Sequence, residues 1–457
     1  MHQFNPTKKG EIVELEVFDL AFGGKGVAKL EGMVVLVNNA VPGDMIKARI
    51  LKRKRSFAEA EALEIIRESD KRTKPRCFHF GYCGGCMLQN LKYQEQLQYK
   101  TKQVKDSLVH IGGFKDIEIN PIIESEKLYF YRNKMEFSFE ENEAGELILG
   151  LHYRGRYDRV FDLRECYLQS ELSNQIVDWT RKFFKDKKLS TYDLKKHQGF
   201  LRYLSVKEAK NTSEVMVNLV TNKGDFPYQE EFAKGLLEKF PKIQSVVRNI
   251  NSRLATIAVG EEEVLLDGKD FITEKVGDFL FDLSANSFFQ TNSYQVEKLY
   301  NVVKDFADLK GEENVLDLYC GIGTISIYLS PQAKNVIGVE SLAQSVEDAQ
   351  RNAQKNKVSN CEFICGEAKK VLSELITRGE KFDIVVVDPP RAGLHPNVVE
   401  YLSDIKIEKL IYVSCNPATL ARDLKLFCER GYKLSQVQPV DMFPHTPHIE
   451  TVVEFIS

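Results

Sequence analysis

The sequence predicts a multi-domain α/β protein with three parts: a small N-terminal β-barrel, a central α+β domain and a C-terminal, doubly wound, mostly parallel sheet. At 457 residues the chain is longer than a single hydrophobic core usually supports. Strand-like runs and turns dominate its first part, whereas helix and strand patterns alternate regularly in its last part. We expect the parts to cover residues 1–65, 66–283 and 284–457.

The composition is that of a folded protein without a strong overall charge. Hydrophobic residues make up 43% and charged residues 28% of the chain, and the formal net charge is -3. Any nucleic-acid-binding surface must therefore be local. No apolar run approaches the ~20 residues that span a bilayer, and the N-terminus lacks a signal-peptide pattern. We expect a cytoplasmic monomer with no membrane partner.

The first part contains strand-like runs at 11–21, 32–41 and 44–55, with glycine and proline turn signals between them. This pattern predicts a small, OB-like β-barrel, because closing a short sheet removes its edges. The third run ends in a basic stretch, residues 52–55. A solvated strand end explains this stretch, but small barrels with a basic rim are also common RNA-binding modules.

The stretch RTKPRCFHFGYCGGCMLQN concentrates cysteine, glycine and aromatic residues. It contains Cys77, Cys83 and Cys86, and Cys166 is the plausible fourth ligand of a metal site. Four thiolates suit either zinc or an iron–sulfur cluster, and the spacing alone slightly favours zinc. Nine cysteines in a reducing compartment can also be unligated core residues. An amphipathic helix is expected next, over about 93–110.

The C-terminal part carries the signs of a nucleotide-type cofactor site. In NVLDLYCGIGTISIYL, Gly321 and Gly323 let the backbone approach a ligand at the end of a strand. Ser326 stands where a dinucleotide fingerprint has its third glycine, which disfavours an iron–sulfur oxidoreductase that binds a dinucleotide. Glu340 ends the next strand and can bind ribose hydroxyls, and Asp388 ends FDIVVVDPP. Together they predict a Rossmann-like domain that binds S-adenosylmethionine.

The stretch VSCNPATL places Cys415 where the strand KLIYVS ends. This strand follows the one that ends in Asp388, so the two residues should border one crevice. A cysteine thiolate can add to C6 of uracil and turn C5 into a nucleophilic carbon. An ordinary thiol is only a few per cent ionised near neutral pH, so the site must favour its deprotonation. We predict that Cys415 is the nucleophile.

A methylated C5 must also lose its hydrogen before the thiolate can leave. The stretch DMFPHTPHIETVVEF offers Asp441, His445, His448 and Glu450. Glu450 opens an apolar strand, where desolvation would raise its pKa and its basicity. We predict Glu450 as the base. An ordinary strand-end carboxylate is the alternative, and the two histidines lack an evident third ligand for a metal.

The combination of SANSFFQTN, DLYCGIGT, DPPRAG, SCNPATL and HIETV with four cysteines and a barrel resembles the RNA (uracil-5-)-methyltransferase family. Bacterial members methylate uridines in 23S ribosomal RNA, and relatives act on the T-loop of transfer RNA. The N-terminal part is similar to a TRAM domain. The resemblance implies a [4Fe–4S] cluster rather than zinc at the four cysteines. It also implies S-adenosylmethionine contacts at Gln290, Tyr319, Glu340, Glu367 and Asp388, with Cys415 as nucleophile and Glu450 as base.

The predicted function is therefore methylation of C5 of a uridine in 23S ribosomal RNA. The same chemistry on a transfer RNA T-loop is the first alternative. A non-catalytic, RNA-binding ribosome assembly factor is an alternative of another class. A base in a stack must be flipped out before Cys415 can reach it. The stretch YFYRNKMEFSF, with Arg132 and Lys134, could hold the RNA, although it also fits a strand with one solvated face.

Overall fold

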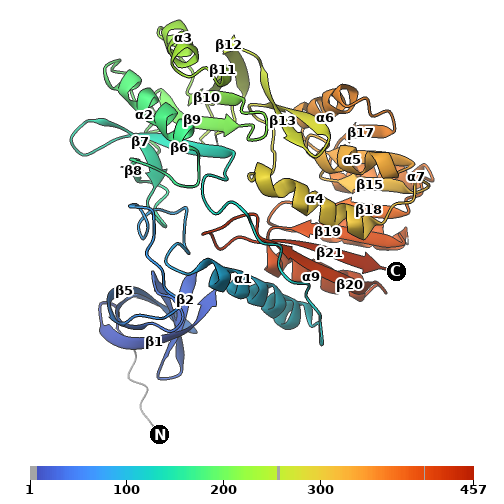
Figure 1. Ribbon diagram of the computed structural model, residues 1–457, viewed down its shortest axis with the longest axis horizontal. Helices are drawn as coiled ribbons and strands as arrows, with labels where there is room; N and C mark the ends of the chain where they lie inside the picture. Colours follow the sequence, from blue (N-terminus) through green and yellow to red (C-terminus); the bar gives the residue numbers. More distant parts are fainter. Residues whose placement is uncertain (1–7, 255–257, 406) are drawn as a thin grey trace.

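The computed structural model describes residues 8–254, 258–405 and 407–457. It contains a barrel, a central sheet and a C-terminal sheet, with the barrel set apart from the C-terminal sheet (Figure 1). Within the described ranges no helix is both long and apolar enough to cross a membrane.

The N-terminal part is a closed five-stranded barrel with the strand order β1-β2-β3-β5-β4. Strand β1 closes it by pairing with both β2 and β4, and β3 runs parallel to β5. Alternate residues point inward, so that small and branched side chains fill the interior. The predicted small β-barrel is confirmed. Its strands are β1 Ile12–Ala21, β2 Lys25–Leu30, β3 Met33–Asn38, β4 Met45–Arg53 and β5 Phe57–Arg67.

The central part is a seven-stranded sheet with the order β12-β11-β10-β9-β6-β7-β8. All its pairs are antiparallel except β10 with β11. Helices α2 and α3 pack on one face through a core rich in phenylalanine. The elements are β6 Lys134–Glu141, β7 Leu147–His152, β8 Val160–Asp162, α2 Glu171–Lys185, β9 Leu201–Glu208, β10 Val215–Thr221, α3 Gln229–Lys239, β11 Ile243–Ile250 and β12 Glu262–Gly268; a hairpin, β13 Phe271–Val276 and β14 Phe279–Ser284, follows.

The C-terminal sheet has the order β17-β16-β15-β18-β19-β21-β20. Its first five strands are parallel, and β21 is antiparallel to β19 and β20. Separate hydrophobic clusters cover the two faces, one with α4 to α6 and one with α7 to α9, as expected for a doubly wound sheet. The elements are α4 Ser293–Ala307, β15 Asn314–Leu318, α5 Thr324–Leu329, β16 Asn335–Glu340, α6 Ala343–Lys355, β17 Cys361–Cys365, α7 Ala368–Thr377, β18 Ile384–Val387, α8 Pro396–Asp404, β19 Lys409–Ser414, α9 Pro417–Cys428, β20 Lys433–Val440 and β21 Glu450–Ile456.

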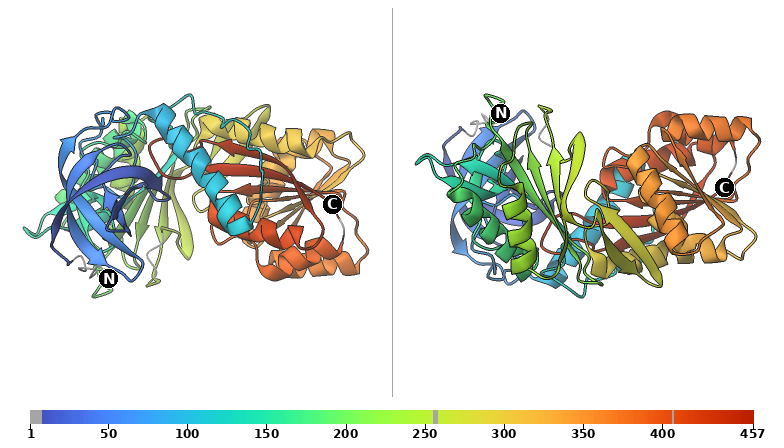
Figure 2. Two further views of the ribbon diagram at one scale, coloured as in Figure 1. Left: turned by 90° about the horizontal axis from the view of Figure 1, so that it is seen from below. Right: turned by 90° about the horizontal axis from the view of Figure 1, so that it is seen from above.

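Helix α1, Tyr93–Ser107, continues as a π-helical turn to Gly112 and ends at Gly113, which has φ 76°. The predicted helix is confirmed. It lies between the barrel and the C-terminal sheet (Figure 2). Val104 packs into the core under α9, while Gln103 donates to the barrel carbonyl of Leu20 at 3.3 Å. The helix therefore connects the barrel with the C-terminal sheet.

Candidate active site

Strand pairing brings Cys415 and Glu450 to the same edge of the C-terminal sheet. Because β19 and β21 are antiparallel, Ser414 pairs with Thr451. Cys415 follows the first of these and Glu450 precedes the second, so both lie at the end of the ladder. Asp388 follows β18, which is parallel to β19, and therefore reaches the same edge. This edge holds the carboxyl ends of the parallel strands, where α/β sheets bind their ligands.

The surroundings of Cys415 keep its thiol protonated in the free protein. The side chain is half-buried. Burial, together with the negative charges of Glu450 and Asp388, raises the pKa of Cys415 to about 11, and Arg391 opposes this rise.

Glu450 is only 3% exposed. Burial raises its pKa well above the usual range, the carboxylate of Asp388 adds to this effect, and Arg391 opposes it. Among the described residues, its Oε2 atom has no hydrogen-bond partner. A desolvated carboxyl group with a free oxygen can exchange a proton with a ligand.

The loop after β15 adopts an unusual backbone. Tyr319, Gly321 and Gly323 have φ angles of 68°, 54° and 79°. For tyrosine this left-handed conformation is strained, and such strain often marks a binding site. Glu340 holds the loop, since its Oε2 atom accepts from Gly321 N at 3.2 Å. Two predicted site residues, Tyr319 and Glu340, and both glycines of the loop are thus in one small region.

Two carboxylates lie beneath this loop. Gln290 Nε2 donates to Asp388 Oδ2 at 3.1 Å. Burial raises the pKa of Asp388 to about 7, and the hydrogen bond from Gln290 opposes it. The buried Asp317 accepts from Ser326 Oγ at 2.6 Å. Ser326, which interrupts the dinucleotide pattern, is therefore the partner of a buried acid.

Glu367 lies at the start of α7 and is exposed. The residue before it, Gly366, donates to the backbone oxygen of Glu340 at 2.9 Å. Glu367 therefore lies on the neighbouring strand end, at the rim of the region formed by Tyr319 and Glu340.

The loop before β21, residues 441–449, is fixed by helix α1. Lys100 and Asp441 form an ion pair of 2.6 Å, with side chains 1% and 0% exposed. Lys100 also donates to Phe443 O at 3.0 Å. His445 N donates to Gln96 Oε1 at 2.9 Å. These contacts position the segment that leads into Glu450, and they give His445 a structural role.

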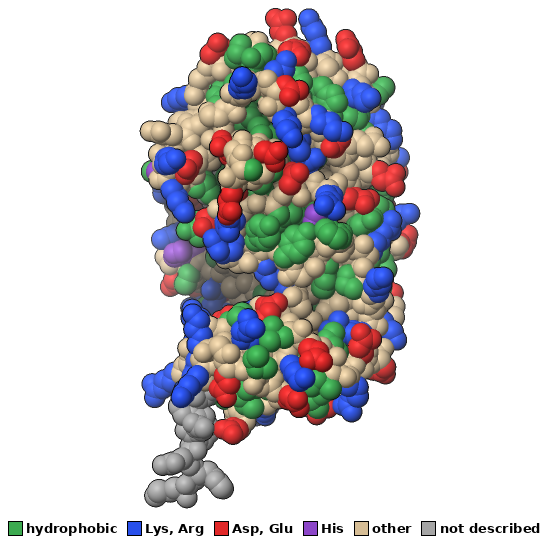
Figure 3. All heavy atoms as spheres, turned by 90° about the vertical axis from the view of Figure 1, so that its left-hand side faces the viewer, with side chains coloured by type: hydrophobic (Ala, Val, Ile, Leu, Met, Phe, Trp, Pro, Cys, Tyr) green, Lys and Arg blue, Asp and Glu red, His purple; other side chains and the backbone are tan. Residues whose placement is uncertain are grey.

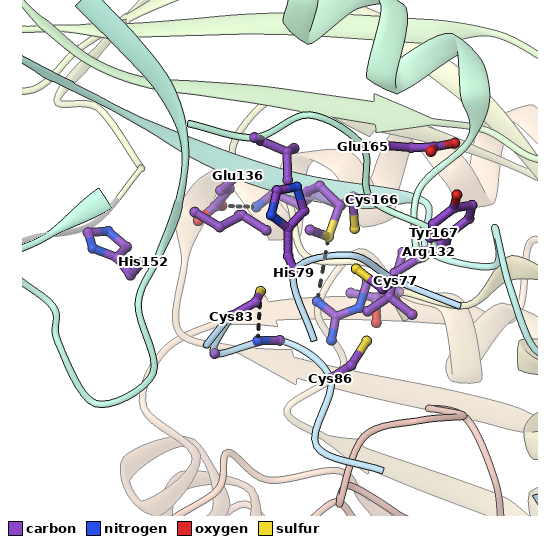
Figure 4. A pocket seen from close by; sticks show the side chains of 18 of the residues that line it. Cys77, His79, Cys83, Cys86, Arg132, Glu136, His152, Glu165, Cys166 and Tyr167 are labelled. Atoms are coloured by element: carbon purple, nitrogen blue, oxygen red, sulfur yellow. Dashed lines mark hydrogen bonds and ion pairs between the residues drawn. The ribbon is translucent and has the colours of Figure 1, made fainter. Parts of the chain in front are cut away.

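Four cysteines surround one cavity of about 520 Å³ in the central part (Figure 4). Burial raises the pKa of all four thiols. Arg132 extends into the same space, where its guanidinium donates to the sulfur of Met135 at 3.7 Å. Among the described residues, no group of three or more His, Cys, Asp or Glu is arranged so that it could hold a metal ion. The predicted metal centre is thus not confirmed. The four residues are Cys77, Cys83, Cys86 and Cys166.

The cavity and the predicted active site share a wall. Phe288, Phe289 and Thr291 line the cavity, while Gln290, between the last two, bonds to Asp388. The segment therefore separates the cysteine cavity from the edge that carries Cys415.

The sequence did not single out Arg391 or Asn416. Asn416 Nδ2 donates to Arg391 O at 3.1 Å and caps α9 by accepting from Ala418 N. The two loops that carry Asp388 and Cys415 are joined in this way. An Asn-Pro pair after a strand is a recognisable helix-start signal, but the effect of Arg391 on Cys415 depends on contacts across the sheet.

The fold and this site define a class: an α/β methyltransferase fold with a thiol and a buried carboxyl group at its ligand-binding edge, preceded by a β-barrel. Comparison with known proteins identifies the family within this class. The family model for tRNA (Uracil-5-)-methyltransferase matches residues 92–456, and the TRAM domain model matches residues 6–63. The chain belongs to the tRNA (uracil-5-)-methyltransferase family. The predicted enzyme class, RNA (uracil-C5)-methyltransferase, is confirmed.

Relatives match over nearly the full length. An uncharacterized RNA methyltransferase of Clostridium tetani is 40% identical over 98% of this chain and 97% of that protein. One from Halalkalibacterium halodurans is 39% identical over the same shares. Among solved structures, Pyrococcus abyssi tRNA (uracil-54, C5)-methyltransferase in complex with S-adenosyl-L-homocysteine has a TM-score of 0.78 and 34% identity, covering 97% of this chain and 99% of that one.

Proposed function

We propose that this chain uses S-adenosylmethionine to methylate C5 of a uridine in 23S ribosomal RNA, with Cys415 as nucleophile and Glu450 as base. The observation that carries this proposal is the antiparallel pairing of β19 with β21, which places a thiol beside a buried carboxyl group with a free oxygen. Methylation at a nitrogen would need neither group.

In the proposed reaction the Cys415 thiol gives its proton to solvent, and the sulfur forms a bond to C6 of uracil. The C5 carbon, now an enolate carbon, would take the methyl group of S-adenosylmethionine, with S-adenosylhomocysteine as the leaving group. Glu450 then removes the hydrogen from C5, the C5–C6 double bond re-forms, and the thiolate leaves. S-Adenosylmethionine, when bound, supplies the methyl group and a positive charge that favours the ionised forms of both residues.

The cofactor contacts proposed for this chain are Gln290, Tyr319, Glu340, Glu367 and Asp388. The glycine loop after β15 and Asp388 after β18 support them, because the order of the strands reverses between β15 and β18. Glu340 would accept from ribose hydroxyls with the lone pairs that its loop contacts leave free. Glu367, at the rim, would face the adenine.

We further propose that the four cysteines hold a [4Fe–4S] cluster, with zinc as the alternative. What supports this proposal is the donor set: four cysteines, two buried and two half-buried, line one cavity. Such a cluster would cross-link the two cysteine loops. Visible absorption and metal analysis of anaerobically purified protein distinguish iron from zinc.

The test of the reaction uses RNA with tritium at C5 of uridine. The wild-type enzyme should release tritium to water when S-adenosylmethionine is present. Cys415→Ala should release none. Glu450→Gln should accumulate a covalent protein–RNA adduct that denaturing gels detect. Turnover by Cys415→Ala would exclude it as the nucleophile.

Transfer RNA is the second candidate substrate, and the similarity to the P. abyssi tRNA enzyme favours it. Unmodified 23S ribosomal RNA and transfer RNA transcripts should be compared in the same assay at equal uridine concentration. A higher kcat/KM for the transfer RNA would replace the ribosomal assignment and leave the chemistry unchanged.

A further inference from the structure

The two loops that carry the cysteines also display pairs of arginine and aromatic side chains on the protein surface. Phe78 is 71% exposed, and Arg164 Cζ lies 5.1 Å from the centre of its ring. On the other side of the first cysteine, Arg76 Cζ lies 4.4 Å from the ring centre of Tyr167. Each loop thus contributes an arginine to one pair and a ring to the other.

A hollow of about 590 Å³ lies beside the first pair. The aromatic rings that line it pack against one another; the ring centres of His79 and Phe161, for example, are 4.9 Å apart and their planes are inclined by 34°. His79 is held on both sides, since Nδ1 bonds to Tyr82 Oη at 2.6 Å and Nε2 accepts from Arg164 N at 3.2 Å. The hollow is therefore rigid and preformed. Its lining residues are Phe78, His79, Tyr82, Tyr153, Phe161, Asp162 and Arg164.

The second pair leads from this surface toward the active site. Arg76 Cζ also lies 5.2 Å from the ring centres of both Tyr129 and Phe130. The ring of Tyr129 lies on that of His445, with centres 4.4 Å apart and planes inclined by 30°. His445 belongs to the 441–449 loop that leads into Glu450. The second pair and this loop are thus connected by direct ring contacts, and the first pair is joined to the second through the two loops that carry both pairs.

Phe130 has a φ of 59°, a conformation that is a clear outlier for a bulky residue. It is held there because its N–H donates to Tyr167 O at 2.7 Å. Such strain persists where the surrounding structure enforces it, commonly at ligand sites. The strained backbone presents the Phe130 ring to Arg76.

We propose that these residues form a stacking track for unpaired RNA nucleotides, running from the hollow at Phe78 past Tyr167 toward Cys415. This inference rests on the proposed function. Aromatic faces bind any base by stacking, and arginine both stacks on a base and pairs with phosphate. The face that carries β7, β8 and the barrel shows hydrophobic side chains gathered among both basic and acidic side chains (Figure 3). The arginines of the two pairs favour a nucleic acid over an apolar protein partner.

The matched variants are Phe78→Leu, which removes the ring but keeps an apolar side chain, and Phe78→Tyr, which keeps the ring. Their affinity should be measured by fluorescence anisotropy with a short unstructured RNA and with an RNA duplex of equal length. Phe78→Leu should bind the unstructured RNA about 5- to 100-fold more weakly than wild type, and Phe78→Tyr should restore binding. Duplex affinity should be equal in all three proteins. S-Adenosylmethionine affinity and thermal unfolding serve as folding controls.

Equal affinity of wild type and Phe78→Leu for unstructured RNA would overturn the proposal, as expected if the hollow binds a protein. An equal loss on duplex RNA would also overturn it, because stacking requires unpaired bases. If Phe78→Leu does not fold, Arg164→Met and Tyr167→Leu provide the same comparison. If RNA binding depends on Phe78 but no tritium is released, the stacking track is supported and the proposed methylation is refuted. If tritium is released but RNA binding does not depend on Phe78, the methylation is supported and the stacking track is refuted.

Discussion

The protonated state of Cys415 can be tested directly through its alkylation rate. The pKa of about 11 compares with an ordinary value of 9.0 for a thiol. At pH 7.5 the ionised fraction is then about 0.03%, against about 3% for the ordinary thiol. We therefore expect iodoacetamide to react with Cys415 about 100-fold more slowly than with an unperturbed cysteine. The rate should rise about tenfold for each pH unit up to at least pH 9.

The measurement follows the Cys415 peptide by mass spectrometry in protein without S-adenosylmethionine or RNA. Two substitutions should change the rate in opposite directions above pH 7. Asp388→Asn removes a negative charge that raises the pKa of Cys415 and should increase the rate. Arg391→Met removes the opposing positive charge and should decrease it. A wild-type rate that levels off below pH 8 would show that the free enzyme already holds a thiolate, which would refute this electrostatic account.

Three further predictions concern stability. Burial and the charge of Asp388 raise the pKa of Asp317 to about 7 from 3.8. The contribution of Asp317 to folding stability is therefore complete below about pH 4 and is lost as the pH rises through 7. Asp317→Asn should stabilise the protein by up to about 4 kcal/mol at pH 8 and by much less at pH 4, and an equal change of Tm at both pH values would contradict this. Lys100→Met leaves the buried Asp441 charge unpaired and should destabilise the protein by about 3–5 kcal/mol in urea unfolding, whereas adding Asp441→Asn should restore most of the loss; additive losses would argue against coupling. Gly393 has φ 79°, and a Cβ there would lie 2.5 Å from Asp423 Oδ2. Gly393→Ala should therefore lower the free energy of unfolding in urea by about 1–3 kcal/mol, and an unchanged value would show that the loop relaxes.

The elements of the site that follow from strand order were predictable from the sequence. Cys415, Asp388 and Glu340 each end a strand, and the carboxyl ends of parallel strands meet at one edge. The apolar strand after Glu450 indicated a desolvated carboxyl group, in agreement with its 3% exposure. Their roles in catalysis and binding stay predictions.

Contacts between parts that are distant in the sequence were not predictable. The period of α1 indicates a helix with an apolar face, but it does not say that this face packs under α9. A lysine on such a helix is expected to face solvent, but Lys100 is buried because it pairs with Asp441. The pattern of the helix could not reveal this partner, which lies 341 residues further along the chain. In the sequence, Ser326 indicates only that a glycine is missing, because the pattern does not reveal that Asp317 accepts from its hydroxyl group.

Strand β21 lies between β19 and β20, although it is the last of the three in the chain. During synthesis β20 is made before its strand partner β21, although residues 120–123 already offer it backbone hydrogen bonds, such as that from Ile123 N to Pro439 O at 3.0 Å. The sheet can close only when β21 is made, which also delivers the carboxyl group of Glu450. A chain without residues 450–456 would thus retain the strands of its barrel and its five parallel strands but would lack both the central antiparallel strand and the carboxyl group of Glu450.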